Sequence, residues 1–149
     1  MIVAERMKFF LIPVASIIIC QLIKLGLSFR RKQTFSIPQL VWDGFWIGKF
    51  PSSHAAVLTS SLYLLALYAE NTSIIAFAVF ISLLVFYGLL EDKKRQEIWE
   101  IYIAKSSDTE LNGIVTDGIL RDFNGHSLFQ LAAGVFIGLV SAVVIDKLF

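Results

Sequence analysis

The sequence is poor in charged residues, and this shortage sets the first limit on its fold. Only 17% of its 149 residues are Asp, Glu, Lys or Arg, whereas 56% are hydrophobic. A soluble domain usually carries about 25% charged and about 45–50% apolar residues, and a chain this short has too little interior to hide the excess. The composition therefore excludes an ordinary soluble enzyme, a disordered chain and a fibrous protein. It predicts a small integral membrane protein.

Cysteine is nearly absent, and the net charge is close to zero. The single cysteine, Cys20, excludes an intrachain disulfide and a cysteine-based metal site. The net charge of +1 produces no field that would attract nucleic acid, so we expect no nucleic-acid partner. Nothing in the sequence indicates haem, nucleotide or metal binding, and we expect no cofactor.

The hydrophobic residues are concentrated in four runs, each close to the ~20 residues that span a hydrocarbon core. Backbone polar groups find no water in that core, so the runs predict α-helices. We expect an all-α bundle of about four transmembrane helices in a single membrane domain over residues 1–149. The spans are predicted near 9–29, 53–70, 74–90 and 126–146, and the polar loops at 30–50 and 91–125.

Two segments allow more than one interpretation. The first run follows two basic residues, as in a signal peptide, but no small-x-small site follows it and it ends in basic residues. We therefore expect a retained span. The stretch with Trp99 and Tyr102 fits either an interfacial helix or a solvated extension of the third span. In a continuing helix, Glu91 and Arg95 would pair at i, i+4.

Four consecutive spans alternate in direction, which places both polar loops on one side of the membrane. Both termini and a short turn at 70–73 lie on the other side. The loop side holds ten of the thirteen basic and nine of the twelve acidic residues, so it is nearly neutral overall. The positive-inside rule would make this side cytoplasmic, although cations kept for an active site would bias the same count. We expect a multi-pass protein of a prokaryotic plasma membrane.

The chain has only two histidines, and each comes at the start of a span that enters from the loop side. His54 follows Pro51-Ser52-Ser53, where proline suits the first helical position and the serine hydroxyls add donors. His126 follows Gly125, which allows close approach of another backbone. The free N–H groups and the dipole of each helix start favour an anion.

Two histidines at neighbouring helix starts predict a phosphate site. One histidine can attack phosphorus while the second protonates the leaving oxygen, and nearby cations hold the phosphoryl oxygens. We expect the two imidazoles to face each other across a gap the size of a phosphate. The alternative is that these polar residues only anchor the helices at the interface or cap them, as Asn124 or Ser127 could do for the last span.

These residues resemble motifs of the divergent branch of the type-2 phosphatidic acid phosphatase family, which is related to bacterial acid phosphatases and vanadium haloperoxidases. Residues 51–54 are similar to its PSGH motif, with Ser53 in place of glycine. Gly125-His126 resembles the end of its SR-x5-H-x3-D motif. Lys24 and Arg31 keep the K-x6-R spacing of the remaining motif, although a lysine stands where proline is expected. The segment 94–96 is similar to an Arg-Arg-Gln segment of the divergent branch.

The resemblance implies a metal-independent helical phosphatase that acts through a phosphohistidine. By position, His126 would be the nucleophile and His54 the general acid. The phosphate-binding candidates are Lys24, Arg31, Ser52, Ser53, Arg121 and Arg95. We expect hydrolysis of a lipid phosphate, meaning a lipid-linked phosphomonoester, or of an isoprenoid pyrophosphate. The alternative is a non-catalytic membrane protein that binds phosphate head groups or acts as an assembly partner.

Gln130 departs from the family pattern, because an acid is expected at this position. At i+4 from His126 it shares a helix face with the ring and can orient it through its amide oxygen, but it supplies no negative charge. Replacing the aspartate of a serine-protease triad by asparagine costs about 10⁴ in rate. The chain is therefore predicted to be a slow phosphatase, one with a rearranged site, or a protein that only binds.

Two glycines in the last span predict close helix packing. Gly134-x-x-x-Gly138 fits a contact within the bundle or between protomers of a homo-oligomer, and we favour the contact within the bundle. Lys24 lies about one turn from the end of its span, where it either snorkels to the interface or pairs with another group.

Overall fold

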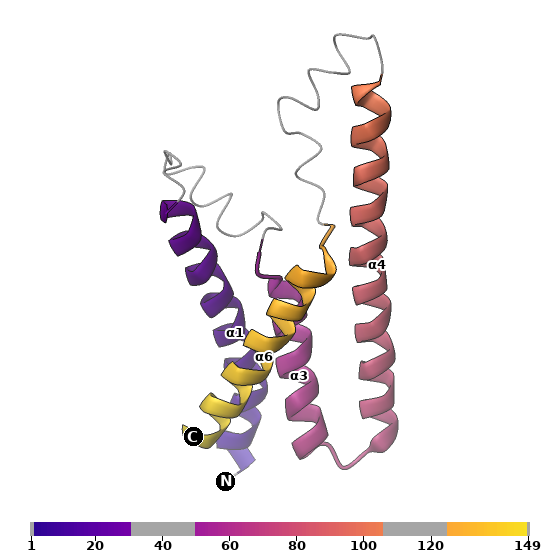
Figure 1. Ribbon diagram of the computed structural model, residues 1–149. Helices are drawn as coiled ribbons and strands as arrows, with labels where there is room; N and C mark the ends of the chain where they lie inside the picture. Colours follow the sequence, from indigo (N-terminus) through magenta and orange to yellow (C-terminus); the bar gives the residue numbers. More distant parts are fainter. Residues whose placement is uncertain (1, 31–49, 106–124, 149) are drawn as a thin grey trace.

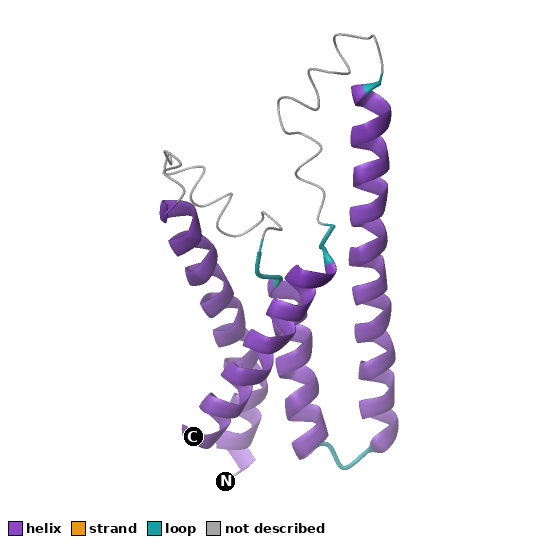
Figure 2. Cartoon of the chain, viewed as in Figure 1, coloured by secondary structure: helices purple, strands orange, loops and turns teal. Residues whose placement is uncertain are grey.

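The computed structural model describes residues 2–30, 50–105 and 125–148, which form four α-helices (Figures 1 and 2). They are α1 (Ile2–Arg30), α3 (Ser53–Tyr68), α4 (Thr72–Ala104) and α6 (Leu128–Leu148), and these described ranges contain no strand. Helices α1, α4 and α6 are each long and apolar enough to cross a membrane. The predicted all-α membrane bundle is confirmed, and the three long apolar helices fit a multi-pass membrane protein.

The helices alternate in direction as the sequence predicts. Figure 1 shows both termini at one end of the bundle, together with the short connection from α3 to α4. Helices α1 and α4 end, and α3 and α6 begin, toward the opposite end, which we call the site end. At the α3–α4 turn, the Asn71 side chain accepts a hydrogen bond from the Ser73 N–H at 2.9 Å and caps α4.

Three helices differ from their predicted bounds: α1 begins at Ile2 rather than near residue 9, α3 ends at Tyr68 rather than near residue 70, and α4 is longer. Helix α3 has 16 residues, or about 24 Å, which is shorter than the ~30 Å of a hydrocarbon core. Helix α4 does not end near residue 90 but continues through residues 91–104, which were assigned to a polar loop. Glu, Lys, Arg and Gln are strong helix formers, and Arg95 pairs with Glu91 at 2.7 Å as expected for a helix. This stretch is therefore an extension of the third span.

Helix α6 packs against α3 through its two glycines. A Cβ added to Gly134 would lie 2.8 Å from the Ala55 Cβ, and one added to Gly138 would lie 2.8 Å from the Ala56 Cα. No side chain larger than hydrogen fits at either position without movement of the helices. The glycine pair therefore serves packing within the bundle, which is the interpretation the sequence favoured.

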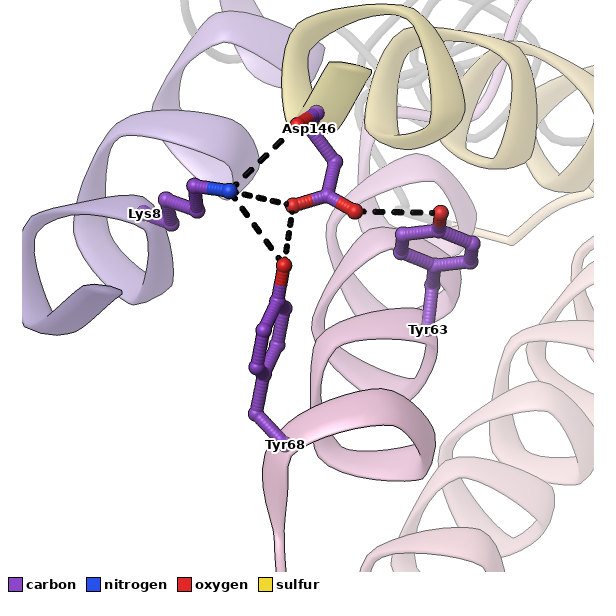
Figure 3. A network of polar contacts seen from close by, with 4 residues as sticks. All are labelled: Lys8, Tyr63, Tyr68 and Asp146. Atoms are coloured by element: carbon purple, nitrogen blue, oxygen red, sulfur yellow. Dashed lines mark hydrogen bonds and ion pairs between the residues drawn. The ribbon is translucent and has the colours of Figure 1, made fainter. Parts of the chain in front are cut away.

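The end of the bundle opposite the site is joined by a polar network that the sequence analysis did not predict (Figure 3). Lys8 of α1 pairs with Asp146 of α6 at 2.8 Å, and their side chains are only 14% and 11% exposed. The hydroxyls of Tyr68 and Tyr63, both on α3, donate to the same carboxylate at 2.6 and 3.3 Å. One aspartate thus connects three helices in a region where unpaired charge is costly.

Candidate functional site

The structure brings the two histidines together at the site end. His54 is the second residue of α3, and His126 lies two residues before α6 begins. Their ring centroids are 5.6 Å apart and the ring planes are almost perpendicular, at 88°. This is ordinary edge-to-face contact between rings. Two residues that are 72 positions apart in sequence therefore share one site, but no phosphate-sized gap separates them in this state.

The start of α3 is held against α6 by Ser52. Its side chain accepts a hydrogen bond from the Ala55 N–H at 3.3 Å, so Ser52 is the N-cap of α3. Its own N–H donates to the Gln130 carbonyl of α6 at 3.1 Å, and the residue is fully buried. Pro51 consequently lies before the cap rather than at the first helical position. Ser52 is therefore enclosed by contacts within the bundle, whereas the neighbouring Ser53 is only half-buried.

Helix α4 positions His126 through its backbone. The His126 N–H donates to the Leu89 carbonyl at 2.9 Å. A Cβ added to the preceding Gly125 would lie 2.6 Å from the Lys93 Cα, so only glycine allows the segment to approach α4 this closely. The close approach predicted for this glycine is therefore present, and its partner is α4.

Ser127 and Gln130 form a capping box at the start of α6. The Gln130 N–H donates to the Ser127 hydroxyl at 3.3 Å, and the Gln130 side-chain oxygen accepts from the Ser127 N–H at 2.7 Å. Of the two predicted caps, Ser127 fills the role, whereas Asn124 lies outside the described residues. Gln130 thereby binds the backbone of the residue next to His126.

A lysine reaches the same site from α1. The Lys24 ammonium donates to the Ser53 hydroxyl at 3.3 Å, and Ser53 is the residue before His54. Lys24 is partly buried and points toward α3, so it pairs rather than only snorkelling to the interface. Lys24 of the K-x6-R spacing and the Ser53-His54 pair of the PSGH-like segment are thus brought together.

Arg95 is the one other predicted cation among the described residues, and it is not part of this cluster. Arg95 is 65% exposed and pairs with Glu91 on α4. Arg31 and Arg121 lie outside the described residues. Within the described ranges, no three His, Cys, Asp or Glu side chains come close enough together to hold a metal ion.

The two histidines differ in accessibility. His126 is fully buried, whereas His54 is exposed and borders a cavity of about 450 Å³. We call this cavity the α1–α3–α4 groove. Its lining residues are Ile17, Gln21, Ser53, His54, Val57, Leu58 and Val85.

Gln21 is a residue that the sequence analysis did not assign to the site. It lines the groove with Ser53 and His54 and lies three residues before Lys24 on α1. The available signal was a strongly polar side chain within an apolar span, one turn from a lysine.

These observations define the class of protein as an all-α membrane bundle with paired histidines at one end. A comparison with family models extends the assignment, because the model described as the Divergent PAP2 family matches residues 6–141. The chain therefore belongs to the divergent PAP2 family, and this membership relates it to phosphatases. Comparison with curated proteins and with solved structures gave no match.

Proposed function

We propose that the chain is a membrane phosphatase that hydrolyses a lipid-linked phosphomonoester or pyrophosphate through a phosphohistidine. The contact between the His54 and His126 rings, with centroids 5.6 Å apart, is the observation that carries the proposal. Lys24 and Ser53 beside His54 supply donors for phosphoryl oxygens. Family membership supports the same class of chemistry.

The proposed reaction has two steps. An imidazole nitrogen of His126 attacks phosphorus while His54 donates a proton to the leaving oxygen, which releases the alcohol or the shorter phosphate. Water then attacks the phosphohistidine, with His54 accepting its proton, and phosphate leaves. Lys24 offsets the negative charge on the phosphoryl oxygens in both transition states.

Substrate must separate the two rings before it can react. The rings are in direct contact and His126 is fully buried, so a phosphoryl group has no room between them in this state. His54 is the exposed partner and lies in the first turn of α3. We therefore propose that the His54 side chain turns away as the phosphoryl group enters beside Lys24.

Gln130 limits the rate in this mechanism. Its side-chain oxygen accepts a hydrogen bond from the Ser127 N–H. This contact holds the backbone at Ser127 and brings no charge next to His126. A neutral side chain stabilises a developing imidazolium less than a carboxylate does. We expect turnover well below that of a site with an acid at this position.

Two observations on the site also favour a second function. The burial of His126 and the uncharged Gln130 both fit a protein that binds phosphate head groups without turnover. Such a protein would still use Lys24 and Ser53 for binding. It would bind lipid phosphate saturably and release no inorganic phosphate.

The test is phosphate release from a panel of lipid phosphates and isoprenoid pyrophosphates by the purified protein. We expect His126→Asn to abolish release and to lose the acid-labile phosphoryl label that the wild type acquires from a radiolabelled substrate. Thermal melting of the variant checks that it folds. Binding without release by the folded wild type would instead establish the second function.

The roles of the two histidines can be separated by the leaving group. Nitrophenyl phosphate needs little help from an acid, because nitrophenolate leaves without a proton. His54→Asn should therefore form the phosphohistidine from nitrophenyl phosphate nearly normally, but slowly from an alkyl phosphate. Equal losses on both substrates would show that His54 is not the general acid.

A further inference from the structure

The α1–α3–α4 groove extends from His54 along α3 toward Leu58. His54 and Ser53 border it at the site end, and four of its seven lining residues are apolar. The face of α3 that lines it is the one opposite the face packed on α6, since residues 53, 54, 57 and 58 lie about 180° from 52, 55 and 56 at 100° per residue. The short helix α3 therefore lines the groove with one face and packs against α6 with the opposite face.

Polarity changes in one direction along the groove. On α1, Lys24 contacts Ser53, Gln21 follows one turn deeper, and Ile17 lies about 10 Å below Lys24. On α3, Val57 and Leu58 follow one turn below the serine and histidine. The groove therefore places cationic and hydroxyl groups at one end and aliphatic side chains at the other, which matches an amphipathic ligand with an anionic head.

Helix α4 forms the third wall of the groove, and its apolar lining residue also lies away from the polar end. Val85 of α4 lies four residues, or about 6 Å, before Leu89, whose carbonyl binds the His126 N–H. Val85 is 37% exposed, so the groove is open to its surroundings between α1 and α4. A chain lying in it would extend from the histidines toward the bilayer centre.

We infer that the α1–α3–α4 groove binds a hydrocarbon chain of a lipid phosphate whose phosphoryl group lies at Lys24, Ser53 and His54. The inference rests on the proposed function, since the head must occupy that site. A methylene group is close in size to a water molecule, whose share of the liquid is about 30 Å³. A cavity of about 450 Å³ is therefore large enough for at least one hydrocarbon chain.

The experiment compares matched tryptophan variants on α4. Val85 lines the groove, whereas Val79 is on the same helix and equally exposed, at 40% against 37%, but is not part of the lining. Phosphate release is measured for water-soluble alkyl phosphates from two to six carbons. In the wild type and in Val79→Trp, kcat/KM should rise about fourfold per methylene transferred from water into the groove. In Val85→Trp the rise should fall below twofold.

A second pair guards against a variant that fails to fold. Leu58→Trp fills the groove from α3, and Leu67→Trp places the same side chain at an exposed position on α3 outside the lining. The slope with chain length is a ratio, so it does not depend on the fraction of folded protein. Identical slopes within both pairs would overturn the groove inference, whereas release from ethyl phosphate would still uphold the proposed function.

A binding measurement decides the inference if the wild type releases no phosphate. An alkyl phosphate with a diazirine halfway along its chain should label Ile17, Val57 and Val85, and excess unlabelled alkyl phosphate, but not the corresponding alcohol, should suppress the labelling. Val85→Trp should reduce labelling several-fold relative to Val79→Trp. Labelling that spreads over lipid-facing residues and resists competition would mean that bulk lipid fills the groove and that the inference is wrong.

Discussion

Replacing Gly125 by alanine tests how α4 positions His126. The added Cβ would lie 2.6 Å from the Lys93 Cα and 2.8 Å from the Asp92 carbonyl carbon. Because carbon atoms pack at about 3.5–4.0 Å, the segment must move away from α4 by about 1 Å. The hydrogen bond from the His126 N–H to the Leu89 carbonyl is 2.9 Å long. A shift of that size stretches it beyond the ~3.2 Å limit of such bonds.

Both stability and activity should respond to this shift. A buried N–H left without its partner costs about 1–3 kcal/mol. For a chain of this size each kcal/mol lowers the melting temperature by about 2–4 °C, so we expect Gly125→Ala to melt roughly 2–12 °C below the wild type. A displacement of about 1 Å at a catalytic group lowers the rate about 100-fold, and phosphate release should fall by that factor.

Gly88→Ala is the matched control, because a Cβ at Gly88 on α4 meets nothing within 4 Å. It should leave the melting temperature and phosphate release close to wild type. Thermal melting in detergent and hydrogen–deuterium exchange of the His126 amide are both independent of turnover, and exchange should accelerate only in Gly125→Ala. Unchanged melting and unchanged exchange in Gly125→Ala would refute the contact between this segment and α4.

Three other variants test separate parts of the bundle. Gly134→Ala should lower the melting temperature by an amount that reflects about 1–3 kcal/mol of overpacking against Ala55, whereas Gly26→Ala, with open space at its Cβ, should not. Asp146→Asn should lower the melting temperature by several degrees but leave the substrate preference unchanged, because the network lies at the end opposite the site; an altered preference would contradict this separation. Gln130→Glu keeps the capping box and restores a charge beside His126, so it should raise phosphate release, and a fall would show that the charge has no favourable role.

The sequence predicts the site's location because topology decides it. Alternating spans bring the start of α3, which contains His54, and the start of α6, which follows His126, to one end, whatever the side-chain packing. Side-chain packing sets the distance between the two histidine rings and the burial of each ring. The sequence could therefore not predict either of them. His126 is buried because the segment before α6 lies against the α4 backbone, and that contact depends on the position of a neighbouring helix.

The network around Asp146 was missed for a related reason. Its members lie near the ends of three different helices. A single lysine or tyrosine at such a position is common at a membrane–water interface and does not stand out in the sequence. Only the antiparallel arrangement of α1 with α3 and α6 brings Lys8, Tyr63, Tyr68 and Asp146 to one level. Residue type and spacing within any single helix carry no sign of this arrangement.

The change from apolar to charged sequence in α4 also sets the depth of the site. The apolar run of α4 ends at Leu90, and His126 binds the carbonyl of Leu89, so the histidine lies where hydrocarbon gives way to the polar interface. Helix α3 is about 24 Å long, so with its C-terminal end at the opposite interface His54 begins below the membrane surface. In the proposed function, a lipid phosphate would place its chain at the level of Val57 and Val85. If the chain acts as proposed, the length of α3 favours a substrate that resides in the bilayer.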